Sequence, residues 1–153
     1  MEATTITFEV LGPPVPQPRA RWANGHTYTP TKNGIKVFKA AVALQAAAVA
    51  RRAGWEASDG PHAIDIECVF ERPPSHLTRS GELRAGSPSF PGMRAGDWDN
   101  LAKGAQDAIT TSGAVWHDDT QVVDGHCRKR YASRGELART VVTITRLPDA
   151  AAS

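Results

Sequence analysis

The chain has 153 residues, of which 41% are hydrophobic and 22% are charged, and its formal net charge is +2. This composition predicts one globular domain with a buried core and leaves little room for a second domain. No apolar run approaches the roughly 20 residues of a membrane-spanning helix, and no signal-peptide pattern opens the chain, so we expect a cytoplasmic protein with no membrane partner.

Basic residues gather in the first third of the chain, where Glu2 and Glu9 are the only acidic residues before Trp55. The basic residues of this stretch are Arg19, Arg21, Lys32, Lys36, Lys39, Arg51 and Arg52. Such asymmetry suits a protein that approaches a polyanion while it holds cations against it. A solvated surface explains scattered basic residues equally well, so charge alone leaves both interpretations open.

The first predicted element is a strand, Ile6–Leu11, which ends at the proline-rich segment 12–18. Proline lacks the backbone N–H that a strand ladder needs, so this segment should be extended and stiff. It carries Arg19 and Arg21 toward a predicted turn and short strand at 25–28.

An alanine-rich helix is predicted from about Asn33 to Arg52, with Asn33 as a candidate N-cap and Gly54 as its stop. One face of this helix carries Ile35, Phe38, Val42 and Val49. Lys36 and Lys39 fall on a different face. The apolar face is therefore expected to pack on the core.

The segment 64–70 alternates in the manner of a strand with one buried face. Its buried residues would be Ile64, Ile66, Cys68 and Phe70, with Asp65 and Glu67 facing solvent. The segment 72–96 is rich in Pro, Ser, Gly and Arg without a sustained period, which predicts a long loop. Its position before an acidic motif makes it a candidate for contact with substrate.

Two closing strands are predicted at 122–131 and 140–145, joined by a turn at 133–135. The predicted fold is α/β (α+β): one small domain over 1–147, with a mixed β-sheet packed against two main helices, followed by a disordered tail at 148–153. Cys68 and Cys127 stand singly in separate strands, which excludes a CxxC metal site and predicts reduced, buried thiols.

The stretch Asp97-Trp98-Asp99-Asn100-Leu101-Ala102-Lys103 is the most informative part of the chain. If a helix begins near Asp99, then Asp99, Lys103 and Asp107 form one polar stripe at i, i+4 and i+8. The opposite side would carry Leu101, Ala105, Ala108 and Ile109. Asp97 and Asp99 flank the helix start, where free amides favour negative charge, and Asp99 could itself be the cap. A purely structural role for these acids stays open.

A second acidic pair, Asp118-Asp119, comes just before a predicted strand. Like charges brought together are unfavourable unless a cation neutralises them, so a metal site is the simplest explanation. Carboxylates without His or Cys partners favour Mg²⁺ or Mn²⁺ over Zn²⁺. In such a site Lys103 could stabilise charge on a phosphate, which makes a metal-dependent nuclease the leading hypothesis.

These motifs resemble those of the RusA-type Holliday junction resolvases. The order D-x-D-N-L-x-K-x-x-x-D-A runs from Asp97 to Ala108, and Asp118-Asp119-Thr120-Gln121-Val122 is similar to a second signature, D-D-x-Q-V. The proline and arginine opening at 12–21 and the run Lys129-Arg130-Tyr131 support the resemblance, which spans about Phe8 to Ile144. One departure is Arg94-Ala95-Gly96, where many members place a basic residue and proline directly before the first Asp.

The resemblance implies a homodimer that binds four-way DNA junctions and resolves them with Mg²⁺, for which Mn²⁺ would substitute. It implies paired symmetric nicks in DNA recombination and repair. By position, Asp97, Asp99 and Asp119 would be the metal ligands, Asp118 would support or join them, and Lys103 would be the essential basic residue. Asp107 also matches the pattern, but a structural pairing with Lys103 explains it at least as well.

Several assignments keep an alternative. The candidates for DNA contact are Arg19, Arg21, Arg94, Lys129 and Arg130, together with Lys36 and Lys39. Each alone is more often simply a solvated surface charge. Trp98 could stack on an unpaired base, but we favour core packing.

Two rival families are weak: D-x-D glycosyltransferases need a larger fold, and an HD-type phosphohydrolase around His117-Asp118 needs further histidine ligands. The serious alternative is a non-catalytic or weakly catalytic branched-DNA-binding protein of the same fold. The complete acidic set argues against it.

Overall fold

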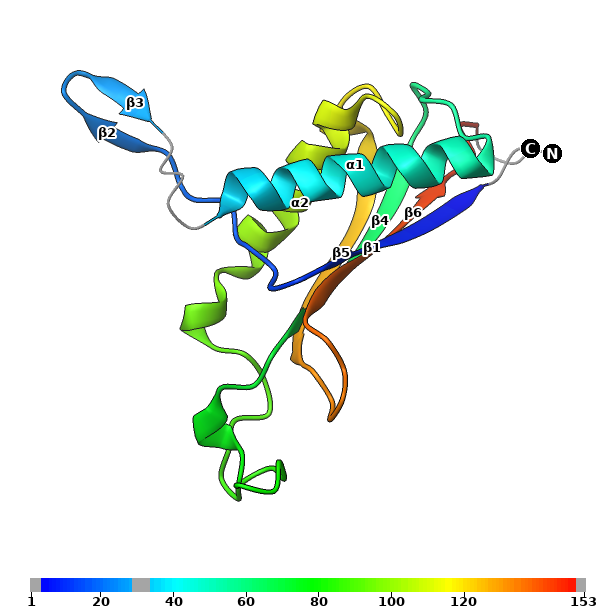
Figure 1. The fold of residues 1–153 in the computed structure, drawn as a ribbon. Coiled ribbons are helices and arrows are strands. Elements are labelled where there is room, and N and C mark those ends of the chain that lie inside the picture. Colours follow the sequence, from blue (N-terminus) through cyan, green and yellow to red (C-terminus); the bar gives the residue numbers. More distant parts are fainter. Residues whose placement is uncertain (1–3, 29–33, 151–153) are drawn as a thin grey trace.

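The computed structural model describes residues 4–28 and 34–150, and within them a four-stranded sheet carries two α-helices on one face (Figure 1). In pairing order the strands are β1 (Thr5–Leu11), β6 (Arg139–Arg146), β4 (His62–Phe70) and β5 (Val122–Tyr131). The helices are α1 (Ile35–Ala53) and α2 (Trp98–Ser112), and β2 (Arg21–Ala23) and β3 (His26–Tyr28) form a separate hairpin. The predicted α+β class is confirmed.

The sheet is mixed, as predicted. β6 pairs antiparallel with both β1 and β4, whereas β4 and β5 run parallel. A parallel pair needs a crossover connection, and α2 lies on the path of the chain between β4 and β5. β5 is the last strand in the pairing order and is therefore an edge strand. The start of α2 lies beside it, because the indole of Trp98 contacts Cys127 of β5.

Both helices and the sheet bury their apolar faces in one core. The strands contribute alternate residues, Ile6, Phe8 and Val10 from β1 and Ile64, Ile66 and Cys68 from β4. The predicted α2 face, Leu101, Ala105, Ala108 and Ile109, is buried, and so are Ile35, Phe38 and Val42 of α1. Val49 and Phe70 are only partly buried against this core. The periodicity therefore identified the correct face of each element.

The ends of α1 bear on two predictions. The candidate cap Asn33 lies outside the described residues, and the helix begins at Ile35 after Gly34. Gly54 ends the helix with φ 66°, a left-handed conformation that glycine adopts without steric cost, and its N–H donates to the carbonyl of Ala50. The predicted stop is confirmed.

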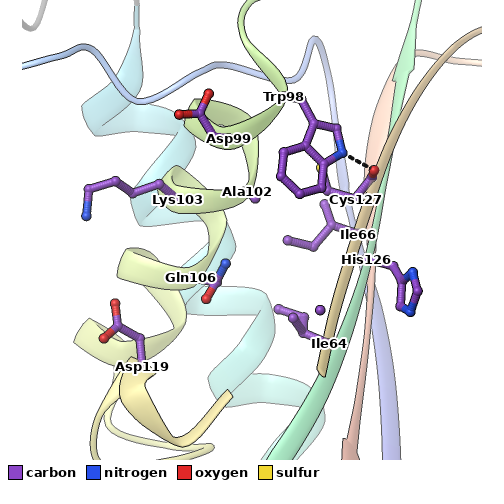
Figure 2. Close-up of a pocket in the computed structure, with 11 residues that line it drawn as sticks. Ile64, Ile66, Trp98, Asp99, Ala102, Lys103, Gln106, Asp119, His126 and Cys127 are labelled. Atoms are coloured by element: carbon purple, nitrogen blue, oxygen red, sulfur yellow. Dashed lines mark hydrogen bonds between the residues drawn. The ribbon is translucent and has the colours of Figure 1, made fainter. Parts of the chain in front are cut away.

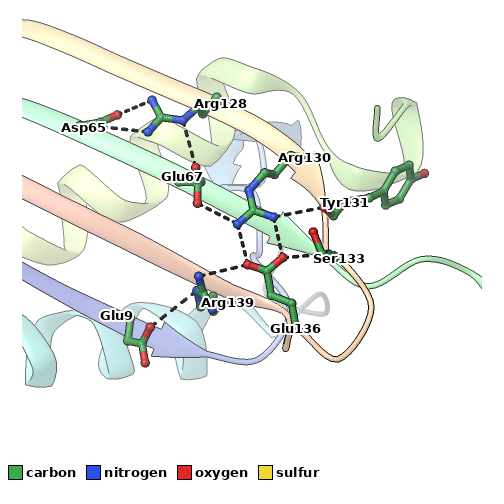
Figure 3. Close-up of polar contacts among 9 residues, drawn as sticks. All are labelled: Glu9, Asp65, Glu67, Arg128, Arg130, Tyr131, Ser133, Glu136 and Arg139. Atoms are coloured by element: carbon green, nitrogen blue, oxygen red, sulfur yellow. Dashed lines mark hydrogen bonds and ion pairs between the residues drawn. The ribbon is translucent and has the colours of Figure 1, made fainter. Parts of the chain in front are cut away.

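The sheet face opposite the helices carries a network of ion pairs (Figure 3). Arg128 donates to both Asp65 and Glu67, and Arg130 donates to Glu67 and Glu136. Arg139 continues the network to Glu136 and to Glu9. Asp65 and Glu67 thus face away from the core as predicted, but they are tied to β5 rather than simply solvated.

The predicted long loop at 72–96 forms an arm that extends away from the sheet (Figure 1). It contains two short 3₁₀ turns, η1 (Pro74–His76) and η2 (Met93–Ala95), among the described residues. The guanidinium of Arg72 donates to the carbonyl of Pro88, and the Arg84 N–H donates to the carbonyl of His76. Hydrogen bonds to backbone carbonyls therefore brace the arm even though no sustained helix or strand runs through it.

Three smaller predictions concern thiols, turns and the tail. Cys68 and Cys127 are both free thiols, but only Cys68 is fully buried. The predicted turn at 133–135 is present, closed by the Glu136 N–H on the carbonyl of Ser133. Of the predicted tail, 151–153 lies outside the described residues and 148–150 forms no helix or strand. None of the described helices is long and apolar enough to cross a membrane.

The network predicts a specific acid sensitivity. Hydrogen bonds from Arg130 lower the pKa of Glu136 from 4.5 to about 2. Because the folded pKa is depressed, the network stabilises the protein fully above about pH 4.5, and this contribution is lost as the pH falls toward 2. We expect Glu136→Gln to lower the free energy of unfolding in urea at pH 7, with a difference from wild type that narrows below pH 4.5. Glu82→Gln, at an exposed glutamate of the arm, is the control. A difference that does not change with pH would contradict this role.

Candidate active site

A pocket of about 250 Å³ lies between α2 and the edge strand β5. Asp99, Lys103 and Asp119 line one side of it, and Figure 2 shows these three side chains on the same side of α2. The remaining wall consists of Ile64, Ile66, Trp98, Ala102, Gln106, Gly125, His126 and Cys127. Two carboxylates and an ammonium group therefore share a cavity with a largely apolar wall. The two acidic signatures, distant in sequence, meet here.

The start of α2 places Asp99 and Lys103. Asp97 is the N-cap, in an extended conformation, and its carbonyl accepts from the N–H of Leu101 at 3.0 Å. Asp99 therefore lies in the first turn, and the expectation that it is the cap was wrong because the helix begins one residue earlier, at Trp98. Lys103 follows Asp99 by one turn and lies on the same face.

Asp107 lies further along this stripe and has a structural role. Its carboxylate is 3.5 Å from the ammonium of Lys103 and 3.8 Å from that of Lys39 on α1. It does not line the pocket. The predicted pairing of Asp107 with Lys103 is confirmed, and Lys39 adds a second partner that joins the two helices.

A capping box holds Asp119 at the pocket. Asp118 caps the 3₁₀ turn η3 (Asp119–Gln121) and accepts from the Thr120 N–H at 2.8 Å, a bond that lowers the pKa of its carboxyl group. Gln121 accepts from the N–H of Asp118 and donates to the carbonyls of Ser58 and Gly60. Asp118 thus shapes the turn while Asp119 faces the pocket. Sequence reasoning gave Gln121 no role, although D-x-x-Q is a capping-box pattern.

Asp97 lies apart from the pocket. Its carboxylate accepts from Arg19 at 3.3 Å and from the amide of Asn100 at 3.5 Å. The preceding proline-rich segment packs on the start of α2, because the N–H of Gln17 donates to the carbonyl of Asn100 at 2.9 Å. The structure therefore brings together Asp99, Lys103 and Asp119, and leaves Asp97 beside them in an ion pair.

The carboxylates of the pocket are candidate ligands for a metal ion. Among the residues that the structure describes, no three His, Cys, Asp or Glu side chains lie close enough to hold one ion together. Asp99 and Asp119 nevertheless share the pocket, and both offer oxygen ligands. Mg²⁺ is commonly held by one or two carboxylates and takes its remaining ligands from water and substrate phosphate. The residues present fit that mode of binding, and they do not form a closed protein cage.

Trp98 corrects a prediction. Core packing was expected, but 53% of this residue is exposed, and its ring lines the mouth of the pocket. The indole N–H donates to the carbonyl of Cys127, as Figure 2 shows. β5 is an edge strand, so one side of it has carbonyls that no strand partner uses. That free edge captures the indole at the surface, and the expectation of core packing was wrong for this reason.

The candidates for DNA contact fall into two groups. Arg19, Arg21 and Arg94 are exposed: Arg19 follows the proline-rich segment, Arg21 begins β2, and Arg94 lies in η2, shortly before α2. Lys129 instead donates to the carbonyl of Gly96 at 3.0 Å, and Arg130 belongs to the ion-pair network on the opposite face of the sheet. Arg19 in the first group pairs with Asp97 through an exposed contact, whereas the contacts of Lys129 and Arg130 tie parts of the fold together.

Comparison with protein families identifies the family of the chain. The family model of endodeoxyribonuclease RusA matches residues 12–145. The chain belongs to the RusA family. The match spans both acidic signatures, the arm and both helices, so the RusA-family protein is assigned to a class of endodeoxyribonucleases. The resemblance drawn from the two signatures is confirmed. No curated protein matches the sequence.

Gly96 provides a test of how the arm enters α2. It has φ +99°, and an added Cβ would lie 2.6 Å from Cγ of Pro16. We expect Gly96→Ala to lower the free energy of unfolding by roughly 1–3 kcal/mol and to shift the indole N–H signal of Trp98 in a ¹⁵N correlation spectrum. Gly92→Ala is the matched control, because its φ is −100° and its Cβ would meet nothing within 4 Å. Equal effects of the two substitutions would contradict the close packing of Gly96 on Pro16.

Proposed function

We propose that this RusA-family protein is a Mg²⁺-dependent endonuclease that resolves four-way DNA junctions by paired symmetric nicks, in recombination and repair. The observation that carries the proposal is the shared pocket of Asp99, Lys103 and Asp119. Membership of an endodeoxyribonuclease family supports cleavage of DNA, and the motifs that resemble the resolvases support a branched substrate. Mn²⁺ should replace Mg²⁺, since both prefer oxygen ligands.

In this proposal the carboxylates of Asp99 and Asp119 would hold the metal, which when bound would supply activation of a water and would offset negative charge on the phosphate. The ammonium of Lys103, at the rim of the pocket, binds the scissile phosphate and stabilises its developing negative charge. Asp118 acts through the backbone by positioning Asp119. The apolar wall from β4 and β5 strengthens these electrostatic contacts, because it keeps part of the site dry.

Arg19 connects DNA binding with Asp97, the third predicted metal ligand. It holds Asp97 outside the pocket at 3.3 Å, and both side chains are largely exposed. An exposed ion pair of this kind is weak, so a DNA phosphate competes well for the guanidinium. Release of Asp97 would then add a third carboxylate to the site when substrate is bound.

A homodimer follows from the symmetry of the reaction. Two symmetric nicks in one junction need two active sites related by a two-fold axis, which a C2 dimer supplies. The exposed Arg19, Arg21 and Arg94 would follow the phosphates around each site. Binding of the junction should therefore weaken steeply as salt concentration rises.

The proposal predicts that Asp99→Asn and Asp119→Asn each reduce Mg²⁺-dependent cleavage of a synthetic four-way junction by at least about 100-fold, because each removes a ligand charge. Junction binding should be largely retained, since neither change removes a basic residue. Single-turnover cleavage and gel-shift binding, measured on the same protein preparations, separate the two effects.

Asp149→Asn is the matched control, because Asp149 is an exposed carboxylate that follows β6 and does not line the pocket. Cleavage by this variant should equal that of wild type. A wild-type protein that binds junctions without metal-dependent nicking would favour the alternative, a non-catalytic branched-DNA-binding protein. Loss of binding together with cleavage in Asp99→Asn would show that Asp99 supports the fold instead.

A further inference from the structure

The β2–β3 hairpin extends away from the sheet and helices (Figure 1). Within residues 4–28 and 34–150 its two strands pair with each other and join no other strand. Trp22 is 72% exposed and Tyr28 is 42% exposed. A large indole surface held in water at a projecting tip costs hydrophobic free energy, which makes it a candidate contact with a partner.

The geometry of the hairpin holds Trp22 in a defined direction. Asn24 and Gly25 both have positive φ, 51° and 78°, as the central residues of a tight type I′ hairpin turn require. Trp22 is opposite Thr27, and Arg21 is opposite Tyr28. Directly opposed residues share a face and successive residues alternate, so Trp22 lies on one face and Tyr28 lies with Arg21 on the other.

The segment that leads into the hairpin lies beside the start of α2. Arg19 contacts Asp97 at 3.3 Å, and the backbone of Gln17 bonds to Asn100 of α2. Trp22 follows Arg19 by three residues, a distance that extended chain spans in at most about 11 Å. In the proposed function, DNA bound at the pocket would therefore meet the hairpin beside the start of α2.

The chemistry of the hairpin favours a nucleic acid over a protein surface. The chain has no acidic residue between Glu9 and Glu56. Trp22 is flanked in sequence by Arg21 and Ala23, and the turn and the opposite strand carry Asn24, Gly25, His26 and Thr27. The two exposed aromatic rings, Trp22 and Tyr28, lie on opposite faces of the hairpin rather than in one apolar patch. Aromatic rings set among cationic and polar groups are the pattern that stacks on bases.

We infer that the β2–β3 hairpin is a base-stacking element, in which the indole of Trp22 packs on the face of an unstacked base at the branch point. This inference rests on the proposed function. Bases in linear duplex are stacked on both faces, so only a branched or single-stranded substrate offers a free face to the indole. The hairpin would thus contribute to the choice of substrate, while the basic residues contribute to affinity for any DNA.

The test replaces Trp22 by Ala, Leu and Phe and measures binding by fluorescence anisotropy to a four-way junction and to a linear duplex of equal length. Stacking predicts roughly 5- to 100-fold weaker junction binding for Trp22→Ala and Trp22→Leu, a smaller loss for Trp22→Phe, and little change on duplex. The exposed indole is outside the core, so thermal unfolding should match wild type. Leu44→Ala, at an exposed apolar residue of α1, should leave both affinities unchanged.

A second readout detects the stacking itself. 2-Aminopurine placed at the branch point should be quenched by wild-type protein and by Trp22→Phe, but much less by Trp22→Leu. Full affinity of Trp22→Leu for the junction, or an equal loss on junction and duplex, would overturn the inference. A change of oligomeric state in Trp22→Ala would also overturn it, and would identify the hairpin as a contact between copies.

These outcomes are distinct from failure of the proposed function. If wild-type protein cleaves the junction with Mg²⁺ while Trp22→Ala binds and cleaves it equally well, the stacking role of the hairpin is wrong and the proposed function stands. If wild-type protein neither cleaves the junction nor binds it better than duplex, the proposed function and the stacking role of the hairpin are both wrong.

Discussion

The burial of one face of α2 against the sheet is the constraint on which the site depends. Leu101, Ala105, Ala108 and Ile109 are buried in the common core, which fixes the rotation of the helix about its axis. Asp99 and Lys103 then lie on the exposed side of the helix, where they line the pocket beside the edge strand β5. An apolar pattern that serves stability thus decides where a carboxylate and an ammonium group meet.

Three further contacts complete the site around that helix, and each comes from a different part of the chain. The N–H of Gln17 in the proline-rich segment donates to the carbonyl of Asn100. At the end of the arm, the ammonium of Lys129 donates to the carbonyl of Gly96. The capping box around Gln121 sets the turn that carries Asp119. None of these groups needs to touch a substrate. They hold the pocket side chains on rigid elements, which the proposed positioning of a phosphate requires.

Much of the fold was predictable because it follows from local patterns. The alternation in β1 and β4, the apolar face of α2 and the glycine that stops α1 all express period or backbone chemistry within a few residues. The acidic signatures also identified the pocket residues Asp99, Lys103 and Asp119. Contacts between distant segments were not predictable. The pairing of Arg19 with Asp97 joins residues 78 positions apart, and the exposed position of Trp98 depends on a free carbonyl of β5.

The central claim is that Asp99 and Asp119 share one divalent metal, and paramagnetic NMR tests it most directly. Mn²⁺ accepts the same oxygen ligands as Mg²⁺ and broadens the signals of nuclei near it. With substoichiometric Mn²⁺ added to ¹⁵N-labelled protein, we predict that the amide signals of 98–103 and 118–121 broaden first and that excess Mg²⁺ restores them. Broadening centred instead on Asp65 and Glu67, on the opposite face of the sheet, or broadening that Mg²⁺ does not reverse, would contradict the claim.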